Sequence, residues 1–509
     1  MTAYDNFEQH IAQVNDLCCV LNLLNWDART QMPAGGNETR GFQMGTIARH
    51  AQELFAGEKT ARLLAAAEAE IAGEHPDSYR ARAVSQTRQA YEISRRVPVE
   101  LVAELNALKG VAQLYWEEAK KANHFTGFQP YLERMISLSR RVAEAIGYKD
   151  HPYDALLLRY EPGMTAARLK TLFGELRETI LPILRRAVAQ GEPRLDFLQE
   201  QDYPEEAQRN FALETARAFG YDFNRGRLDI SAHPFEVSFT RNDVRITTRY
   251  NPRFLPQALF GTLHETGHAL YEQNVDPALT RTALATDLLD LYAVGGVSYG
   301  AHESQSRLWE NLVGRSRVFW NVHYDRLQRT FPAQLGKVSQ DEFYRAINRV
   351  RPSPIRTEAD EVTYNLHIML RVEIEMALVE GSLAVKDLPQ VWNEKVHLYL
   401  GITPLDDAQG VLQDVHWSAG LVGSFPTYTI GNIMSAQWFE AARAGTPEMD
   451  EALAAGNYSL LFGWLRENVW RHGRAYSASE LLQKATGKDL NTGPYRAYLA
   501  KKYSELFPE

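Results

Sequence analysis

At residues 256–273 the chain reads PQALFGTLHETGHALYEQ, an apolar run that contains the pattern His-Glu-x-x-His. We expect a helix here. On a helix, residues i and i+4 share a face, so His264 and His268 can direct both imidazoles at one point. Two histidines at this spacing can bind a zinc ion. Glu265 follows the first histidine and therefore lies beside the metal, where its carboxylate can take a proton from a water molecule.

The same pattern has a simpler interpretation, which is a polar stripe on a half-exposed helix. Apolar residues surround the motif, however, among them Leu259, Phe260, Leu263 and Leu270. They place the helix in a core, where two imidazoles without a partner would be costly to bury. A bound metal ion removes that cost, so we favour the metal site.

Length and composition limit the class of protein. The chain has 509 residues, of which 45% are hydrophobic, and this is enough for a large core. It carries 55 basic and 64 acidic residues without a long run of Lys or Arg, so we expect no nucleic-acid partner. No stretch approaches the roughly 20 apolar residues that span a bilayer, and no secretory signal is visible. We therefore expect a cytoplasmic protein without a membrane partner.

Most of the chain follows helical spacing, as Phe7, Ile11, Val14 and Cys18 do near the start. No linker rich in Gly, Ser or Pro separates independent domains. We therefore predict one mainly α-helical domain over residues 1–509. It would have a helical N-terminal part at about 1–220 and a part with a hairpin and the catalytic residues at about 221–509.

One region alternates with period two instead. Phe235, Val237 and Phe239 alternate with polar residues, a turn follows at 241–243, and Val244 and Ile246 continue the alternation. This pattern predicts a β-hairpin. Its edge could bind an extended peptide beside the metal site, or the hairpin could serve only in packing, and the sequence leaves both open.

A catalytic zinc ion takes three protein ligands and keeps one position for water. No third histidine follows His268 within the next turns, so a carboxylate from a later helix is the remaining common solution. Glu303 is our choice. Asp287, Asp290 and Glu310 are alternatives that spacing does not separate from it.

Six short motifs follow one another along the chain. They are HPF (233–235), DVRIT (243–247), HETGH (264–268), HESQ (302–305), IRTEAD (355–360) and GVLQDVHW (410–417). Through them the chain resembles, over nearly its whole length, the thermostable carboxypeptidase Taq family of zinc metallocarboxypeptidases. The resemblance implies a mainly α, gluzincin-type peptidase with two lobes around a deep groove and a small β-hairpin near the active site. The segment 280–296 looks longer than is usual in the family, which leaves substrate access open.

The resemblance also implies roles for individual residues. His264, His268 and Glu303 would be the metal ligands. Arg356 would bind the terminal carboxylate of the substrate, and Tyr428 would contact the substrate. A planar guanidinium suits the first of these tasks, because it makes two parallel hydrogen bonds to a carboxylate.

Three more residues are candidates for lining the groove, namely His233, Arg245 and His416. His233 precedes a proline, which holds its backbone extended. Arg245 could equally be a salt-bridged arginine, and His416 could equally be a structural histidine, with no role in the groove.

The function expected from these residues is a metal-dependent carboxypeptidase, with Glu265 as the general base. Its substrates would be peptides with a free C-terminus, and its cofactor one Zn²⁺ per chain, which Co²⁺ or Mn²⁺ could replace at the same ligands. Resemblance to the family further implies a homodimer. Two alternatives stay open, a zinc oligopeptidase or endopeptidase and a metal-stabilised peptide-binding protein without turnover.

Overall fold

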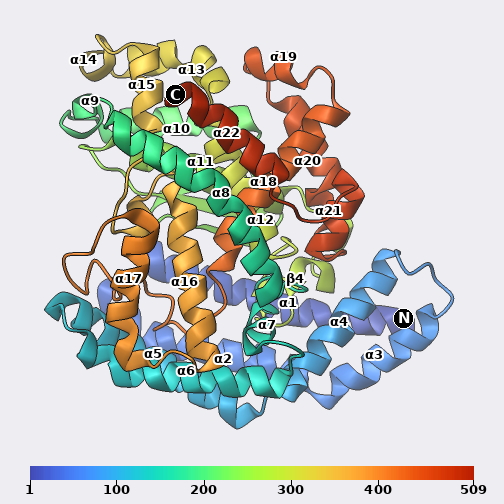
Figure 1. The fold of residues 1–509 in the computed structure, drawn as a ribbon. Coiled ribbons are helices and arrows are strands. Elements are labelled where there is room, and N and C mark those ends of the chain that lie inside the picture. The colour runs from blue at the N-terminus through green and yellow to red at the C-terminus, as the bar shows by residue number, and fades with distance from the viewer. Residues whose placement is uncertain (509) are drawn as a thin grey trace. The chain divides into compact units, whose positions relative to one another are not determined.

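The computed structural model describes residues Met1–Pro508 and is mainly helical with a small sheet, which confirms the predicted fold class (Figure 1). The residues cluster into two compact units. The first unit comprises Met1–Arg95, Arg194–Ile347 and Met434–Leu490, and the second comprises Arg96–Pro193, Asn348–Ile433 and the residues from Asn491 on. The single domain and the groove between two lobes stay predictions.

The first unit holds all the strands and the helix with the His-Glu-x-x-His motif. Its strands are β1 (Leu228–Ile230), β2 (Glu236–Thr240), β3 (Asp243–Thr248), β4 (Thr286–Asp287) and β5 (Tyr292–Ala293). Its α-helices are α1 (Ala3–Thr30), α2 (Asn37–Ala56), α3 (Glu58–Ile71), α4 (Tyr79–Arg96), α9 (Asp196–Gln199), α10 (Glu205–Phe219), α11 (Leu255–Gln273), α12 (Tyr299–Arg307), α13 (Arg317–Thr330), α14 (Pro332–Leu335), α15 (Gln340–Ile347), α19 (Met449–Ala454), α20 (Ser459–Asn468) and α21 (Ala478–Thr486). Its shorter turns are the 3₁₀ helices η1 (Ala34–Gly36), η2 (Pro277–Leu279), η3 (Ala283–Ala285) and η7 (Trp470–His472) and the π-helix η4 (Leu308–Val313).

The regular elements of the second unit are all helices in its described residues, and turns and loops join them. It comprises α5 (Val99–Ala122), α6 (Phe125–Ile146), α7 (Pro152–Leu157), α8 (Ala166–Gln190), η5 (Arg356–Glu358), α16 (Thr363–Glu380), η6 (Val385–Asp387), α17 (Leu388–Leu400) and α22 (Gly493–Leu506). Helix α18 (Pro426–Gly445) begins in the second unit and belongs to the first from Met434 on. Figure 1 shows α5 and α6 lying side by side.

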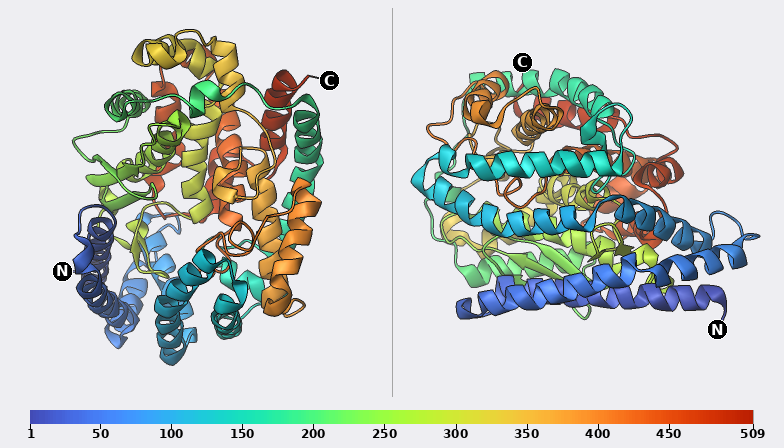
Figure 2. Two further views of the ribbon diagram at one scale, coloured as in Figure 1. Left: turned by 90° about the vertical axis from the view of Figure 1, so that its left-hand side faces the viewer. Right: turned by 90° about the horizontal axis from the view of Figure 1, so that it is seen from below.

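Helix α1 begins with a capping box, in which the Thr2 hydroxyl accepts from the Asp5 amide while the Asp5 carboxylate accepts from the Thr2 amide. Its buried face includes Phe7, Ile11 and Cys18, which is the spacing that the sequence predicts. This face packs on α2, α3 and β2, and Figure 2 shows α1, in dark blue, beside α2.

The predicted hairpin forms from β2 and β3, and a third strand joins it in the order β1-β3-β2. Strand β1 runs parallel to β3, with Leu228 opposite Ile246. At the other edge, the carbonyls of Ser238 and Phe239 accept hydrogen bonds from Asn22 and Cys19 of α1. This part of the β2 edge is therefore covered, which favours a packing role for it over peptide binding.

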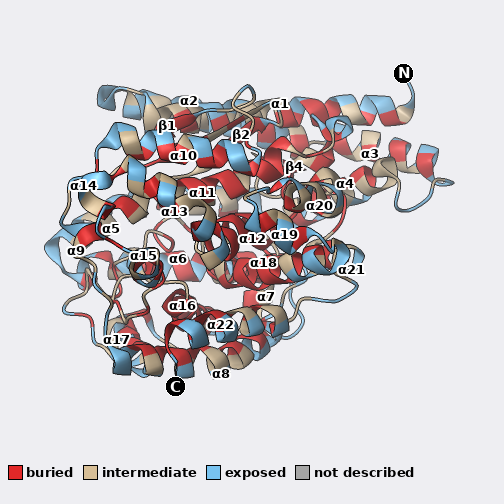
Figure 3. Cartoon of the chain, turned by 90° about the horizontal axis from the view of Figure 1, so that it is seen from above, coloured by how far each residue is buried: buried red, intermediate tan, exposed pale blue. Residues whose placement is uncertain are grey.

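Helix α11 confirms the helix expected at 256–273, and it packs on α10, α12, β2 and β3 in the core of the first unit. Gly267, within the motif, permits the close approach of α12: a Cβ atom there would lie 2.4 Å from the Gln305 carbonyl oxygen. Figure 3 shows α12 coloured mostly as buried. The close approach of the two backbones at Gly267 thus fixes the position of α11 relative to α12.

In the second unit, α16 is buried over most of its surface and packs on α6, α7, α8 and α17. Three polar side chains nevertheless follow one another at a spacing of four residues: His367, Arg371 and Glu375. They form one stripe along the helix, and Arg371 and Glu375 contact the segment that contains the predicted His416. None of the described helices is long and apolar enough to cross a membrane.

Candidate metal centre

Three potential metal ligands meet where α11 packs on α12. One ligand atom each of His264, His268 and Glu303 lies within 4.8 Å of the others. Oε2 of Glu303 is 3.6 Å from Nε2 of His264 and 3.3 Å from Nε2 of His268. The two histidines come from successive turns of α11, and the glutamate comes from the first turns of α12.

The hydrogen bonds around His264 show that this cluster fits a cation. Nδ1 of His264 lies 3.0 Å from Oε2 of Glu310. Because the carboxylate can only accept, Nδ1 carries a proton and donates a hydrogen bond to it. The other nitrogen, Nε2, faces Glu303, which is itself an acceptor. Burial opposes a charged ring, yet Glu303 and Glu310 raise the pKa of His264, so the space between the two carboxylates favours a positive charge. A positive charge between these atoms resolves the contact. Two imidazole nitrogens and one carboxylate oxygen are the ligand set of many catalytic zinc sites.

Arginines fix both carboxylates in the ionised form. Nε of Arg307 donates to Oε1 of Glu303 at 2.7 Å, and Arg315 donates to Oε1 of Glu310 at 3.2 Å. Burial opposes ionisation, yet Arg307 and His264 hold the pKa of Glu303 well below its usual value. Against the same opposition, His264 and the arginines lower the pKa of Glu310 to about 2. Both groups are therefore carboxylates at neutral pH.

The other carboxylates that spacing allowed as third ligands are engaged elsewhere or lie outside the cluster. Glu310 binds the far nitrogen of His264, and Asp287 pairs with Arg474 at 3.1 Å. Among the described residues, Glu303 is the carboxylate that joins the two histidines.

A wide turn positions Glu310. Residues Leu308–Val313 form the π-helix η4, in which the Gly314 amide donates to the Trp309 carbonyl, five residues back, at 2.9 Å. Single π turns are rare and often occur at functional sites. Here the turn follows directly on α12, so Glu303 and Glu310 reach the same cluster from adjoining but different helical geometries.

His268 is supported by ring stacking rather than by a carboxylate. Its ring stacks on His302 with a centroid distance of 4.5 Å, and its Nδ1 is buried without a hydrogen-bond partner among the described residues. His302 in turn contacts Oε1 of Glu272 at 3.0 Å, and Glu272 accepts from the amides of Gly295 and Gly296. Burial and the neighbouring His302 lower the pKa of His268 to about 3, so the ring stays neutral, as a metal ligand must.

Glu265 lies next to the cluster and is not part of it. It is only 6% exposed, and no described residue forms a hydrogen bond with its carboxylate. Burial raises the pKa of Glu265 to about 7 against the opposing charge of His264. A divalent cation nearby would lower this pKa. The carboxyl group of Glu265 is therefore not engaged by any side chain that the structure describes.

Arg356 lies in the second unit, in the short helix η5, and is 8% exposed. Its Nε donates to Oδ1 of Asp414 at 2.9 Å, and its Nη1 donates to the hydroxyl of Tyr364 at 2.8 Å. No described residue accepts a hydrogen bond from its Nη2. Two sides of the guanidinium are thus fixed, and one donor group remains for a ligand.

The other two candidates in the second unit lie beside Arg356. Cζ of Arg356 is 5.3 Å from the centroid of the Tyr428 ring, and the Tyr428 hydroxyl is 3.1 Å from Nε2 of His416. Burial and the Arg356 charge lower the pKa of His416 to about 3. These three side chains form one cluster.

His233 and Arg245 lie in the first unit and are less distinctive. His233 is exposed. Arg245 forms two hydrogen bonds with Asp243, at 2.9 and 2.8 Å, and lies over the ring of Trp26. For Arg245 these contacts match the salt-bridged interpretation, and a role in substrate binding stays a prediction for both residues.

Sequence reasoning did not find the residues that support the candidates. It considered Glu310 only as a ligand, and it did not single out the pairing of Asp414 with both Arg356 and Arg371, at 2.9 and 2.6 Å. A usable signal was present for Arg371, because charged residues four apart in an otherwise apolar helix need buried partners. No such signal exists for the wide turn that holds Glu310.

Comparison with known proteins identifies the family. A sequence model described as Carboxypeptidase Taq (M32) metallopeptidase matches residues 6–503. The chain is 42% identical to Thermostable carboxypeptidase 1 of Thermus thermophilus over 514 residues, which cover 99% of both chains. It is 40% identical to Carboxypeptidase 1 of Bacillus subtilis over 486 residues, which cover 95% of both chains.

Solved structures agree with the sequence comparisons. The crystal structure of the M32 carboxypeptidase from Deinococcus radiodurans R1 superposes with a TM-score of 0.94 at 42% identity, covering 100% of both chains. Trypanosoma cruzi Metallocarboxypeptidase 1 gives a TM-score of 0.90 at 34% identity, covering 100% of this chain and 99% of the other. The chain whose His-Glu-x-x-His helix packs on Glu303 therefore belongs to the carboxypeptidase Taq family of metallopeptidases.

Proposed function

We propose that this metallocarboxypeptidase releases the C-terminal residue of peptides at one divalent ion held by His264, His268 and Glu303. The observation that carries the proposal is the convergence of two imidazole nitrogens and a carboxylate oxygen within 4.8 Å. Zinc is the proposed ion, and Co²⁺ or Mn²⁺ can use the same ligands. When bound, such an ion lowers the pKa of water and polarises a carbonyl group.

Glu265 is the proposed general base. Its carboxylate accepts the proton of the attacking water and later passes it to the nitrogen of the leaving amino acid. Its burial and its lack of a hydrogen-bond partner among the described residues support this role, because a carboxylate held by other side chains would be a weaker base. It remains free to turn from the water to the leaving group.

Arg356 is the proposed site for the terminal carboxylate. Asp414 and Tyr364 hold its Nε and Nη1, which fixes the plane of the guanidinium before substrate binds. Binding of the chain end there restricts cleavage to the last peptide bond. Tyr428, whose ring lies 5.3 Å from Cζ of Arg356, is the proposed further contact to the substrate.

Glu310 is proposed as a positioning residue for His264. A carboxylate on the second nitrogen of a ligating histidine fixes its tautomer and the direction of its ring and makes it a stronger ligand. The distance of 3.0 Å between Glu310 and Nδ1 of His264 supports this role. Glu272 and His302 provide the corresponding support for the ring of His268.

Paired substrates test the proposal. A peptide with a free C-terminus and the same peptide as a C-terminal amide are offered to the wild-type protein, to R356Q and to the control R351Q. Arg351 is a nearby arginine that pairs with Glu192 at the surface of the second unit. We expect the wild type and R351Q to prefer the free peptide by at least about 100-fold in kcat/KM, and R356Q to lose this preference, because charge-assisted hydrogen bonds are strong.

Rapid cleavage of the amide by the wild type would instead favour an oligopeptidase or endopeptidase. A peptide-binding protein without turnover is disfavoured, because the relatives are named carboxypeptidases. Release of free amino acids by protein loaded with a defined metal tests this second alternative. A cytoplasmic homodimer completes the proposal on the resemblance to the family, and light scattering of the purified protein measures the dimer.

A further inference from the structure

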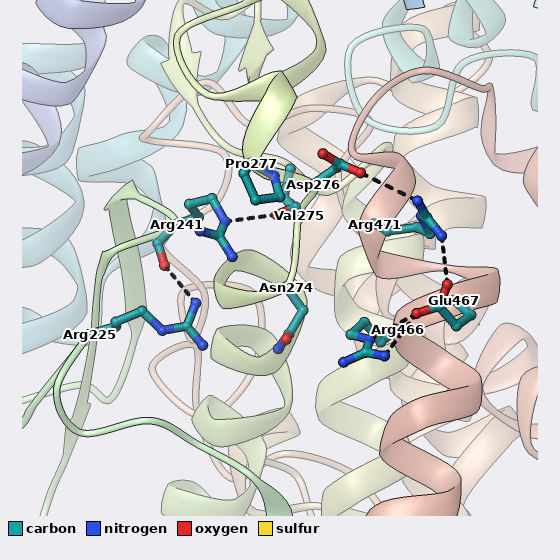
Figure 4. Close-up of a pocket in the computed structure, with 9 residues that line it drawn as sticks. All are labelled: Arg225, Arg241, Asn274, Val275, Asp276, Pro277, Arg466, Glu467 and Arg471. Atoms are coloured by element: carbon teal, nitrogen blue, oxygen red, sulfur yellow. Dashed lines mark hydrogen bonds and ion pairs between the residues drawn. The ribbon is translucent and has the colours of Figure 1, made fainter.

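Apart from the metal cluster, the first unit contains a cavity at the C-terminal end of α11. Its volume is about 480 Å³. We call it the arginine pocket, and it is lined by Arg225, Arg241, Asn274, Val275, Asp276, Pro277, Arg466, Glu467 and Arg471. Figure 4 shows Arg225 and Arg241 on one side of Asn274 and Arg466 and Arg471 on the other. Its residues are distinct from the metal cluster.

Positive charge predominates in this lining, with four arginines against two carboxylates. Arg466 and Arg471 share a single carboxylate, Glu467, at 2.9 and 2.6 Å. Arg471 also lies 3.5 Å from Asp276. Both carboxylates of the lining therefore pair with Arg466 or Arg471, on one side of the pocket.

Arg241, on the opposite side, has no carboxylate partner among the described residues. Its Nε donates to the Val275 carbonyl at 2.9 Å, and its Nη1 donates to the Asn242 side chain at 3.3 Å. Burial and the nearby charge of Arg225 lower the pKa of Arg241 against the opposing charge of Asp276. The cation is thus held at a cost in free energy that a bound anion would reduce.

Donor groups remain for such an anion. Arg225 uses its Nε for Asp222 and its Nη1 for the Gln273 carbonyl, but no described residue accepts from its Nη2. Nη2 of Arg241 and Nη1 of Arg466 likewise have no acceptor in the part of the chain that the structure describes. None of the three side chains is fully buried, so a ligand from solvent can reach them.

We propose that the arginine pocket binds a small oxyanion with two or more negative charges, and that a phosphate or phosphoryl group is the chemistry it recognises. Guanidinium groups match the oxygens of such an anion and remain charged at all relevant pH values. The volume exceeds what a phosphate ion needs and falls within the usual range for small-molecule sites.

The ligand would contact arginine side chains that also donate hydrogen bonds to carbonyl groups at the C-terminal end of α11. Arg225 and Arg241 donate to the carbonyls of Gln273, the last residue of α11, and of Val275 just beyond it. An anion on the outer edges of these guanidinium groups would hold them in place. Binding should therefore raise the unfolding temperature of the protein.

Titration calorimetry of metal-loaded protein with inorganic phosphate at low ionic strength tests the proposal. The variants are R241Q and R466Q, and the control is R443Q, an exposed arginine of the same unit that pairs with Asp450 outside the pocket. R466Q guards against misfolding of R241Q, because Arg466 is exposed and pairs, among the carboxylates that the structure describes, with the adjacent Glu467 alone. Phosphate bound at the metal ion would be unaffected by either pocket variant.

We expect one saturable phosphate site in the wild type and in R443Q, and at least tenfold weaker binding in both pocket variants. Addition of phosphate should raise the unfolding temperature of the wild type and of R443Q more than that of either pocket variant. Absence of saturable binding in the wild type, or binding by R466Q within twofold of the wild type, would overturn the proposal.

Discussion

Oε2 of Glu310 lies 3.0 Å from Nδ1 of His264, while the other nitrogen of the same ring faces Glu303 at 3.6 Å. The ring is therefore held between two carboxylates, and its proton belongs on the side of Glu310. A metal ion bound at Nε2 would leave the remaining proton on Nδ1, where the hydrogen bond to Glu310 fixes the tautomer of the ring.

Replacing Glu310 should weaken metal binding. We expect E310Q and E310A to lower the affinity for Zn²⁺ by about 10- to 100-fold, because loss of a carboxylate behind a ligating histidine has this effect. Competition with a chromophoric chelator measures the affinity. The control is E451Q, which removes an exposed carboxylate of the same unit, in α19. If E310Q and E451Q bind Zn²⁺ with affinities that agree within twofold, Glu310 has no role in metal binding.

Replacing Glu265 should separate metal binding from turnover. The E265Q variant keeps the shape of the side chain and loses the base, so we expect full metal content and a kcat reduced by about 10²- to 10⁴-fold. Elemental analysis measures the metal, and timed release of free amino acids measures turnover. A variant that loses its metal, or that turns over within tenfold of the wild type, would argue against this role.

Replacing Asp414 should destabilise the protein. This carboxylate accepts from the buried guanidinium groups of Arg356 and Arg371, at 2.9 and 2.6 Å. D414N leaves two cations without their counter-charge, for which we expect a loss of about 3–5 kcal/mol in the free energy of unfolding. Urea titration measures it. D450N, which breaks the exposed pair with Arg443, should cost less than about 1 kcal/mol.

The stabilisation by Asp414 should also depend on pH in a defined direction. Burial opposes its ionisation, but Arg371 and Arg356 hold its pKa far below the ordinary value. A depressed pKa means that the stabilisation is complete above the pKa of the unfolded chain, about 4, and is lost as the pH falls below it. The difference in unfolding free energy between wild type and D414N should therefore be constant from pH 5 to about 8 and shrink in acid. A difference that grows in acid would contradict this assignment.

The elements that carry the chemistry could be predicted because each has a regular period. The spacing of His264 and His268 together with the surrounding leucines predicted α11, and the alternation from Phe235 to Ile246 predicted the hairpin. Spacing alone left other carboxylates open beside Glu303, and the resemblance to the family supported the choice of Glu303. The short strand β1, with three residues, is too brief to show a period and was not predicted.

The supporting contacts could not be predicted because they join residues far apart in the chain. Asp414 meets Arg371 across 43 positions, and Glu310 meets His264 across 46. No local pattern specifies such pairs. The burial of Arg356 likewise follows from its partners and not from its neighbours in sequence, most of which are loop residues.

The π turn of η4 places a limit on evolutionary change in this segment. Removing one residue at the start of this segment, for example Trp309, would rotate everything after it by about 100° around the helix axis. Glu303, which precedes the turn, would keep its place, whereas Glu310 would swing away from the imidazole it now contacts. The number of residues in this segment, and not only their polarity, therefore sets the position of Glu310, and substitutions should be tolerated here far more readily than insertions or deletions.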